Sequence, residues 1–398
     1  MLLPLASHAQ NNEEQVQKRV LVLGSTGSVG RSTLEVLRTF PEDFKVVGLA
    51  AGSNVALLNE QIQKFKPEAV VLQNRESHGQ LQLPEGTRCF DQADAVCALV
   101  RELECDIVVS AINGFAGVAP TMEALKLGRR VALANKETLV CAGRFVQSIL
   151  EAHQAAELIP VDSEHSALFQ CLVGNSVASI DKLVLTASGG PFRTLSSTEL
   201  DSVSVEQALA HPTWNMGVAI TIDSACLLNK ALELIEAHWL FALPENQIEV
   251  VVHPQSIVHS MVKFVDGSAL AQLGLPDMKG PIAYALQYPH ARKGPVLESL
   301  DLTACEVLEF LQVDHVKFPA IRLARHCVQA GGDAGLVLNA AKEIAVDNFV
   351  RKKCKFLEIV RAVQWALDQE FGAVADSFDG CCALDREVRS RVSREFFK

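Results

Sequence analysis

Apolar and polar residues alternate in two different ways along this chain. In residues 18–158, short apolar runs rich in β-branched residues are separated by segments with helical periodicity. Continuous apolar strands that alternate with helices are typical of a parallel sheet covered on both faces. We therefore predict an N-terminal Rossmann-like parallel sheet. The predicted strands are RVLVLG ending at Gly24, KVVGLA at Ala50, AVVL at Leu72, DIVVSA at Ala111 and RVALA at Ala134, and the predicted helices span 31–39, 55–65 and 119–127.

The pattern changes after Pro160. KLVLTA, IEVVVH, SMVKFV and SALAQL read as short strands, and Asp266–Gly267 has the composition of a hairpin turn. TIDSACLLNKALELIEAHWLF has helical periodicity, with Asp223 or Ser224 suited to the N-cap. We predict that residues 159–293 form a central α+β catalytic and dimerisation domain.

A Pro- and Gly-rich connector precedes the C-terminal part of the chain. We assign 294–316 to a linker and 317–398 to a helical bundle. Residues 1–17 lack the basic segment of a signal peptide, and we expect a disordered leader. The fold class is therefore α/β with three domains. The helices predicted in the bundle span 320–329, 335–351, 357–371 and 385–397.

Composition excludes several classes of function. The 398 residues carry a formal charge of −11 and no basic stripe, which argues against a nucleic-acid-binding protein. No apolar run reaches the roughly 18 residues that span a bilayer. The eleven cysteines form no C-x-x-C pair, so zinc is not indicated and reduced thiols in a cytosol-like compartment fit best.

A glycine-rich segment joins the first predicted strand to the first helix. VLGSTGSVG places Gly24, Gly27 and Gly30 where backbone N–H groups can approach a phosphate at a helix N-terminus. The alternative is a glycine turn that binds no ligand. The second strand ends in AGSN, where Ser53 and Asn54 replace the carboxylate that a NAD site offers to the ribose. This favours NADP over NAD.

Three further segments carry polar side chains in positions that suit a site. Asn135, Lys136 and Glu137 follow the fifth strand, where ligands bind in open α/β sheets, although an exposed helix N-cap is the alternative. ASGGPFR offers Ser188 and two glycines for anion binding. HPTWNMG reads as a mobile lid that excludes water, or as a surface loop that tucks its Trp into the core.

Two segments of the chain carry acidic residues that could bind a metal ion together. In IPVDSEHSALFQCL, an extended chain would place Asp162 and Glu164 on one face, where they repel each other unless positive charge lies between them. A solvated strand end is the alternative. In DSACLLNKALELIE, helical spacing places Asn229 and Glu233 on one face beside Lys230. Asp162, Glu164 and Glu233 together have the composition of a site for Mg²⁺ or Mn²⁺.

These motifs together resemble one known family. GSTGSVG, ANKET, PVDSEHSALFQC, LTASGGPF, HPTWNMG, DSACLLNKALE and HPQSIVHSMV are similar, in order, to motifs of the 1-deoxy-D-xylulose 5-phosphate reductoisomerases. The resemblance implies a homodimeric enzyme of the non-mevalonate isoprenoid pathway. Such an enzyme converts 1-deoxy-D-xylulose 5-phosphate to 2-C-methyl-D-erythritol 4-phosphate with NADPH and Mn²⁺ or Mg²⁺, in the cytoplasm of a bacterium or in a plastid-type compartment. A retro-aldol/aldol path and a 1,2-shift both remain open.

The resemblance also implies roles for individual residues. Lys136, Asp162, Glu164, Glu233 and His211 would be catalytic, and the three carboxylates would hold the metal. Trp214 and Met216 would belong to a closing flap. Substrate would contact Lys136, Ser163, Glu164, Ser188, His211, Trp214, Ser224, Asn229, Lys230 and Glu233, with its phosphate near Ser188, Ser224, Asn229 and Lys230. NADPH would contact Thr26, Gly27, Ser28, Val29, Gly52, Ser53, Asn54, Asn135, Glu137 and Gly217.

The chain departs from the family pattern at two places. Val218 and Ala219 stand where one or two basic residues usually follow WNMG, and Lys342 replaces the more usual Asn of NAANE. We expect the first departure to lie close to the active site and the second to be peripheral. Two other classes remain: an NADP-linked semialdehyde or homoserine dehydrogenase, which the three carboxylates argue against, and a catalytically silent NADP-binding module.

Overall fold

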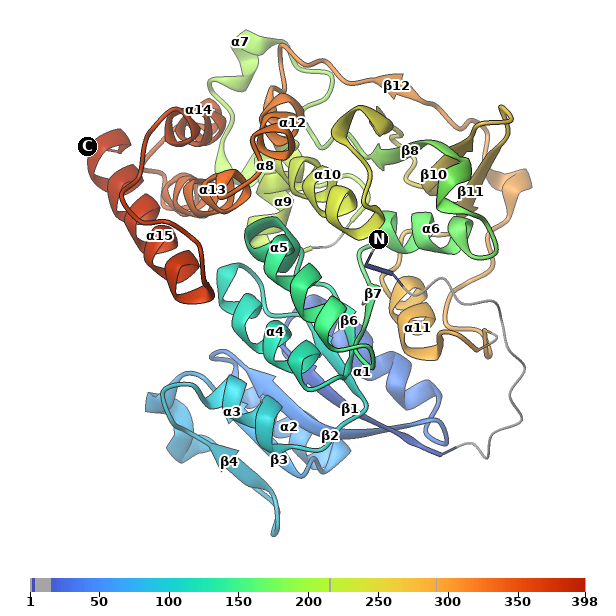
Figure 1. The fold of residues 1–398 in the computed structure, drawn as a ribbon, viewed down its shortest axis with the longest axis vertical. Helices are drawn as coiled ribbons and strands as arrows, with labels where there is room; N and C mark the ends of the chain where they lie inside the picture. The colour runs from blue at the N-terminus through green and yellow to red at the C-terminus, as the bar shows by residue number, and fades with distance from the viewer. Residues whose placement is uncertain (1, 4–15, 215, 291, 398) are drawn as a thin grey trace.

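The computed structural model describes residues 2–3, 16–214, 216–290 and 292–397 (Figure 1). The expected disordered leader falls mainly on residues 4–15, which lie outside the described residues. Leu2 donates a backbone hydrogen bond to the carbonyl of Leu240 at 3.0 Å, and Leu3 is buried. Within the described part of the chain, every helix is too short or too polar to cross a bilayer.

The N-terminal part is a seven-stranded parallel sheet with strand order β4-β3-β2-β1-β5-β6-β7. This confirms the predicted Rossmann-like sheet. β4 and β7 were not among the predicted strands, and β7 crosses the expected domain boundary at 158/159. The strands are β1 Lys18–Leu23, β2 Phe44–Ala51, β3 Ala69–Leu72, β4 Arg88–Phe90, β5 Ile107–Ser110, β6 Arg130–Leu133 and β7 Glu157–Pro160; the helices are α1 Ser28–Thr39, α2 Val55–Phe65, α3 Ala95–Glu102, α4 Val118–Lys126 and α5 Glu137–Ala152, with 3₁₀ turns at Arg75–Gln80 and Phe115–Gly117.

Two glycines make the turn between β1 and α1 possible. Gly24 has φ +83°, and a Cβ there would lie 2.3 Å from the carbonyl oxygen of Ala111. A Cβ on Gly30 would lie 2.2 Å from the carbonyl oxygen of Gly24. Both positions therefore require glycine. The turn brings the N-terminus of α1 to the carboxyl edge of the sheet beside the β1–β5 boundary, which is where doubly wound sheets bind ligands.

The central part contains a five-stranded mixed sheet with order β11-β10-β8-β9-β12. Helix α6 packs against β10 and β11, and α11 packs against α1 of the first sheet. The predicted α+β domain is thus present. The strands are β8 Ile180–Ala187, β9 Ile248–Val252, β10 Val258–Phe264, β11 Ala269–Leu273 and β12 Leu311–Gln312; the helices are α6 Ser163–Leu172, α7 Ser197–Leu200, α8 Val205–Leu209, α9 Val218–Ala225, α10 Leu228–Phe241 and α11 Lys279–Gln287, with 3₁₀ turns at Val177–Ser179, Glu245–Gln247 and Leu302–Ala304.

The structure corrects two local expectations. The segment with Asp162 and Glu164 is not extended, because β7 ends at Pro160 and α6 begins directly after Asp162. The helix predicted from Asp223 onward is two helices, because Leu227 adopts φ +60° between α9 and α10. Asp223 therefore lies inside α9 and is not an N-cap. The apolar pattern continues across this break, so periodicity alone does not reveal it.

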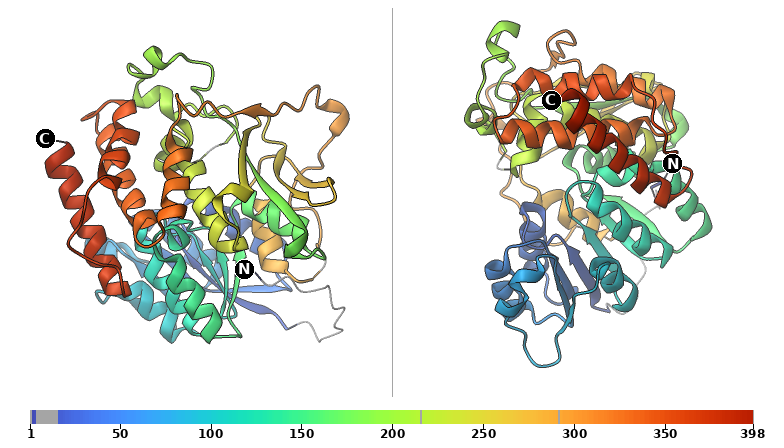
Figure 2. Two further views of the ribbon diagram at one scale, coloured as in Figure 1. Left: turned by 45° about the horizontal axis from the view of Figure 1, so that its top comes forward. Right: turned by 90° about the vertical axis from the view of Figure 1, so that its left-hand side faces the viewer.

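The C-terminal part is the predicted helical bundle, which packs beside α5, α9 and α10 (Figure 2). Most helix ends differ from prediction by a few residues. The last helix begins earlier, at Phe378, because the Ser377 hydroxyl caps it by accepting a hydrogen bond from Gly380 N at 3.1 Å. The helices are α12 Ala320–Ala330, α13 Ala334–Val350, α14 Phe356–Leu367 and α15 Phe378–Arg391, followed by a π turn at Val392–Phe396.

Candidate active site

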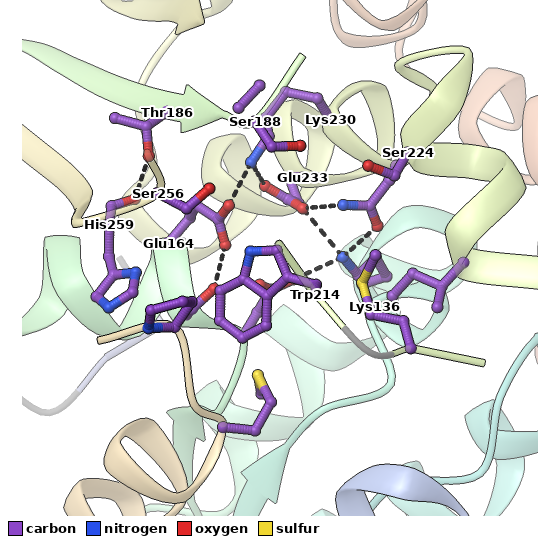
Figure 3. Close-up of a pocket in the computed structure, with 18 of the residues that line it drawn as sticks. Lys136, Glu164, Thr186, Ser188, Trp214, Ser224, Lys230, Glu233, Ser256 and His259 are labelled. Atoms are coloured by element: carbon purple, nitrogen blue, oxygen red, sulfur yellow. Dashed lines mark hydrogen bonds and ion pairs between the residues drawn. The ribbon is translucent and has the colours of Figure 1, made fainter. Parts of the chain in front are cut away.

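A cavity of about 310 Å³ opens where the N-terminal sheet meets the central domain (Figure 3). The start of α1, the segments after β6, β7 and β8, the residues that follow His211, and α10 all contribute to its wall. It gathers sequence-predicted residues that are far apart in the chain. Those that line it are Ser28, Val29, Lys136, Asp162, Ser163, Glu164, Ser188, Trp214, Met216, Ser224, Asn229, Lys230 and Glu233.

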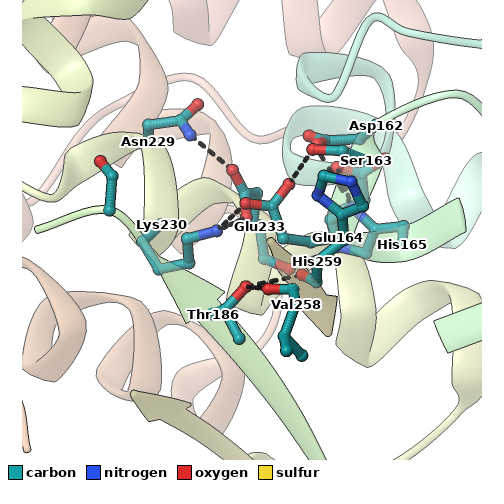
Figure 4. A network of polar contacts seen from close by, with 12 residues as sticks. Asp162, Ser163, Glu164, His165, Thr186, Asn229, Lys230, Glu233, Val258 and His259 are labelled. Carbon is teal, nitrogen blue, oxygen red and sulfur yellow. Dashed lines mark hydrogen bonds and ion pairs between the residues drawn. The ribbon is translucent and has the colours of Figure 1, made fainter. Parts of the chain in front are cut away.

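Three carboxylates meet inside this cavity. Asp162, Glu164 and Glu233 each bring one oxygen to within 4.8 Å of the other two. Lys136 Nζ lies 2.6 Å from Asp162 Oδ2 and 3.2 Å from Glu233 Oε1. Lys230 Nζ lies 2.7 Å from Glu164 Oε1 and also contacts Glu233 Oε2 (Figure 4). The positive charge that the sequence requires between the carboxylates is therefore present as two ammonium groups.

Burial and charge together determine how these groups ionise. Burial raises the pKa of Glu164, and the neighbouring Glu233 carboxylate raises it further. Burial also acts to raise the pKa of Asp162, but the Lys136 ammonium and His165 outweigh it and lower that pKa. The pKa values of Lys136 and Lys230 are raised, because the carboxylates outweigh burial, which acts to lower them. Both lysines thus remain protonated at neutral pH.

The donor set fits a hard divalent cation. Mg²⁺ and Mn²⁺ prefer carboxylate oxygens, and three such oxygens converge here beside a cavity that admits water. A cation bound by Asp162, Glu164 and Glu233 would compete with the two ammonium groups. Each lysine would then be released to contact an anionic ligand in the same cavity.

A second layer of buried groups supports Asp162. His165 Nδ1 lies 3.8 Å from Asp162 Oδ2 and 3.3 Å from Glu236 Oε2, and its Nε2 lies 2.9 Å from the carbonyl oxygen of Glu233. Burial, as the largest cause, raises the pKa of Glu236 to about 7. Glu236 was missed in the sequence, although it lies one helical turn after Glu233.

The flap loop, residues 211–217, folds against the cavity. His211 Nε2 lies 3.0 Å from Ser188 Oγ, and its Nδ1 accepts hydrogen bonds from the backbone N of Thr213 and Trp214 at 3.1 and 2.9 Å. Trp214 and Met216 line the cavity, so the Trp of this loop is not tucked into the core. Asn215 lies outside the described residues. His211 thereby connects the fold of the loop to Ser188.

The residues expected to contact NADPH lie in four segments of the chain, two of which are the β1–α1 turn and the segment after β2. Thr26 and Gly27 precede α1, and Gly52, Ser53 and Asn54 are exposed after β2, with Asn54 capping α2 through Leu57 N at 3.1 Å. These five residues lie outside the wall of the described cavity.

Two other residues expected to contact NADPH have structural roles. Asn135 is buried, and its amide donates to the carbonyls of Ile112 and Gly114 at 2.7 and 2.9 Å and to Glu137 Oε2 at 2.9 Å. Gly217 is the N-cap of α9 and is exposed. Asn135 thus holds the loop after β5 in place through these hydrogen bonds.

Several residues of the cavity wall were missed in the sequence. His259 is the most informative, because it is a buried imidazole on β10 whose ring lies 6.3 Å from that of Trp214. Burial, as the largest cause, lowers its pKa. The two histidines of HPQSIVH are the feature of the sequence that could have indicated His259 as a site residue. The additional wall residues are Ser32, Ala134, Thr186, Ala187, Gly189, Ile220, Leu227, Ser256, Val258, His259, Pro276, Asp277 and Met278.

Lys342 is not peripheral, contrary to the expectation from sequence. Its side chain is 4% exposed and its Nζ lies 3.0 Å from Asp223 Oδ2, whose side chain is 5% exposed. The departure from the family pattern thus lies in a buried contact between α13 and α9. Sequence spacing could not place it there, because 118 residues separate the two partners.

The geometry of His211 predicts its protonation. Because its Nδ1 accepts two backbone hydrogen bonds, the neutral ring carries its proton on Nε2. Burial lowers its pKa, so in ¹⁵N NMR we expect this tautomer at pH 7 and a titration midpoint below about 6.5. Folding stability contributed by the neutral ring is complete above about pH 6.5 and declines as the pH falls below it. A His211→Gln variant identifies the resonance, and a midpoint above 7 or an Nδ1-protonated ring would contradict the assignment.

Comparisons with known proteins agree with this site. Three family profiles match: "1-deoxy-D-xylulose 5-phosphate reductoisomerase" at residues 20–143, its C-terminal domain at 158–241, and "DXP reductoisomerase C-terminal domain" at 273–391. The reductoisomerase of Chloroherpeton thalassium is 47% identical over 94% of this chain and 97% of its own length, and that of Chlorobium chlorochromatii is 51% identical over 92% and 97%.

Solved structures agree as well. The reductoisomerase of Zymomonas mobilis in complex with NADPH matches with a TM-score of 0.88 at 38% identity, over 96% of this chain and 98% of its own. A reductoisomerase in complex with NADPH, fosmidomycin and magnesium also has a TM-score of 0.88 at 38% identity, over 95% and 98%. The dehydrogenase and silent-module alternatives are not favoured. This chain belongs to the 1-deoxy-D-xylulose 5-phosphate reductoisomerase family.

Proposed function

We propose that the cavity is the active site for the NADPH- and divalent-metal-dependent conversion of 1-deoxy-D-xylulose 5-phosphate to 2-C-methyl-D-erythritol 4-phosphate. The observation that carries this proposal is the convergence of three carboxylates and two lysines at the carboxyl edge of a sheet that also presents a glycine turn. Related structures described as complexes with NADPH and with magnesium support both cofactors.

The residues of the cavity divide into those that hold the cation and those that hold the substrate. Asp162, Glu164 and Glu233 would hold Mg²⁺ or Mn²⁺. When bound, that cation supplies Lewis-acid polarisation of the ketone and adjacent hydroxyl. Because the cavity wall presents a cluster of hydroxyl, amide and ammonium donors, we assign the phosphate to Ser188, Ser224, Asn229 and Lys230.

Other residues orient the substrate and exclude water. The Lys136 ammonium contacts both Asp162 and Glu233, so it is placed to stabilise negative charge that develops on a substrate oxygen. Ser163 and His211 complete the polar wall, and His211 donates from Nε2 to Ser188. Trp214 and Met216 add apolar surface to the cavity wall, which would help to keep water from the site of hydride transfer.

We assign NADPH to the β1–α1 turn and the carboxyl edge of the first sheet. Thr26, Gly27, Ser28 and Val29 lie at the N-terminus of α1, where backbone N–H groups can bind the pyrophosphate. Gly52, Ser53 and Asn54 would face the ribose 2′-phosphate. Asn135, Glu137 and Gly217 would lie along the nicotinamide half.

The central sheet also suggests a homodimer. β11 is at one end of the strand order, so one of its edges is free among the described strands. Its Leu270 is 46% exposed, and Val265 in the preceding turn is 69% exposed. Long exposed edges with apolar side chains favour pairing with another chain. A second copy of this chain is the occupant that we propose.

The redox state of the cysteines indicates the cellular compartment in which the protein works. All eleven lie in the described part of the chain and are free. Reduced thiols fit a cytoplasm or the stroma of a plastid-type compartment, and we infer such a location for this enzyme.

The activity is tested by mixing the purified protein with NADPH, Mn²⁺ and 1-deoxy-D-xylulose 5-phosphate and following the loss of nicotinamide absorbance. We expect substrate-dependent oxidation that chelator abolishes and that Mn²⁺ or Mg²⁺ restores. Asp162→Asn, Glu164→Gln and Glu233→Gln should each lower kcat by about a thousandfold, since each removes a ligand from a Lewis-acid site. Full activity in excess chelator would rule out the metal role, and no oxidation in wild type would rule out the function.

Cofactor preference is tested at Ser53. Because the segment after β2 offers no carboxylate, NADPH should exceed NADH in kcat/KM. Ser53→Asp should flatten or reverse that preference, since an aspartate repels the 2′-phosphate and accepts a hydrogen bond from a 2′-hydroxyl. Ser53→Ala serves as the control for loss of the hydroxyl alone. Equal use of both cofactors by the wild type would contradict this role of Ser53.

The dimer is tested by sedimentation velocity. We expect the wild type to sediment as a dimer at micromolar concentration and Leu270→Lys to shift it toward monomer, because a charged side chain on an edge strand opposes pairing. Val374→Lys is the control, since Val374 is 66% exposed in the C-terminal part, outside β11. A monomeric wild type, or a Leu270→Lys variant that dimerises equally well, would contradict the proposal.

A further inference from the structure

A buried ion pair lies just outside the cavity and has no part in the chemistry proposed above. Lys342 of α13 and Asp223 of α9 are both buried, and Lys342 Nζ lies 3.0 Å from Asp223 Oδ2. Asp223 Oδ1 has no hydrogen-bond partner among the described residues. A buried carboxylate with one free oxygen depends strongly on its single cation, because removing one partner of a buried pair leaves an uncompensated charge.

Lys342 lies among several acidic side chains. Three carboxylates act to raise the pKa of Lys342: Asp223, Glu137 and Glu343. Glu343 also pairs with Arg389, whose Nη2 lies 2.7 Å from its Oε2. Lys342 is the cation that acts most strongly on Asp223 and on Glu137, and Lys136 makes a smaller contribution to both. Burial raises the pKa of both these acids, and the Lys342 ammonium opposes that shift in each.

The pair is attached to the catalytic cavity through α9. Asp223 directly precedes Ser224, and both Ser224 and Ile220 of the same helix line the cavity. The helix begins after its N-cap Gly217, the last residue of the flap loop. On the other side of the pair, Lys342 is followed on α13 by Glu343. Glu343 Oε1 accepts a hydrogen bond from Phe115 N at 3.2 Å, which connects α13 to the N-terminal part of the chain.

We propose that Lys342 is a positioning residue for α9. By pairing with Asp223 it holds this helix against α13, so that Ser224 faces the substrate phosphate and the flap loop starts from a fixed point. The inference rests on the proposed function, because it gives Lys342 a part in binding the substrate of that same site. Lys342 touches neither substrate nor cofactor in this account.

The geometry of α9 offers a second position from which a cation could reach Asp223. Ala219 lies one helical turn before Asp223, and residues four apart on a helix are neighbours. A basic residue at 219 could therefore reach the Asp223 carboxylate from within α9. In this chain position 219 is neutral, and the cation that meets Asp223 comes from α13.

The test compares Lys342→Met with the double variant Ala219→Lys/Lys342→Met. Lys342→Met should raise KM for 1-deoxy-D-xylulose 5-phosphate about tenfold, equivalent to about 1.4 kcal/mol, with a much smaller change in kcat. Hydrogen exchange followed by mass spectrometry, without substrate, should become faster in residues 217–227 and stay unchanged in the N-terminal sheet. Adding Lys at 219 should restore most of both effects. Arg351→Met is the matched control, because it removes an exposed ion pair with Asp347 from the same helix and should change neither.

Unchanged KM and unchanged exchange of α9 in Lys342→Met would overturn the proposal, as would a faster exchange spread evenly over the whole protein. Should Lys342→Met not fold, Asp223→Asn/Lys342→Met removes both charges, and wild-type KM and α9 exchange in that variant would overturn the proposal equally. The exchange measurement needs no turnover. Loss of the proposed function would appear separately, as a wild type that does not oxidise NADPH with this substrate.

Discussion

Electrostatic repulsion among Asp162, Glu164 and Glu233 is the constraint on which the site depends. Like charges that share a buried cavity cannot all ionise unless positive charge lies among them. In this structure the ammonium groups of Lys136 and Lys230 lie between the carboxylates. The same arrangement explains why the site suits a divalent cation. Such an ion would place the same charge of +2 at a single point among the carboxylates and would free both lysines for an anionic substrate.

The fold brings these groups together from separate elements. Lys136 and Asp162 follow two neighbouring parallel strands, β6 and β7, whose carboxyl ends meet at one edge of the sheet. Glu233 and Lys230 lie on α10, which packs against α5 and the C-terminal bundle. The bundle therefore serves the site although it adds no wall residue, because it supports the helices that carry the ligands. Lys342 extends this support to α9.

Much of this arrangement could be predicted from sequence. Runs of apolar residues marked the parallel strands because those strands are buried on both faces, and Gly24 and Gly30 marked a turn that excludes a Cβ. The local sequence pattern did not predict the structure where contacts with distant parts of the chain determine it. The helix that starts at Ser163 and the break at Leu227 both lie in segments whose apolar pattern fits another structure equally well. The Lys342–Asp223 contact joins distant segments, and no periodicity encodes it.

We expect Asp162, Glu164 and Glu233 to form one cation site even in the absence of substrate. Electron paramagnetic resonance of Mn²⁺, titrated into the purified protein without NADPH or substrate, measures the free ion directly and hence the number bound. We expect one bound Mn²⁺ per chain in the wild type, and its loss when Asp162, Glu164 and Glu233 are replaced together by their amides. Equal binding by the wild type and the triple variant, or no binding by either, would contradict it.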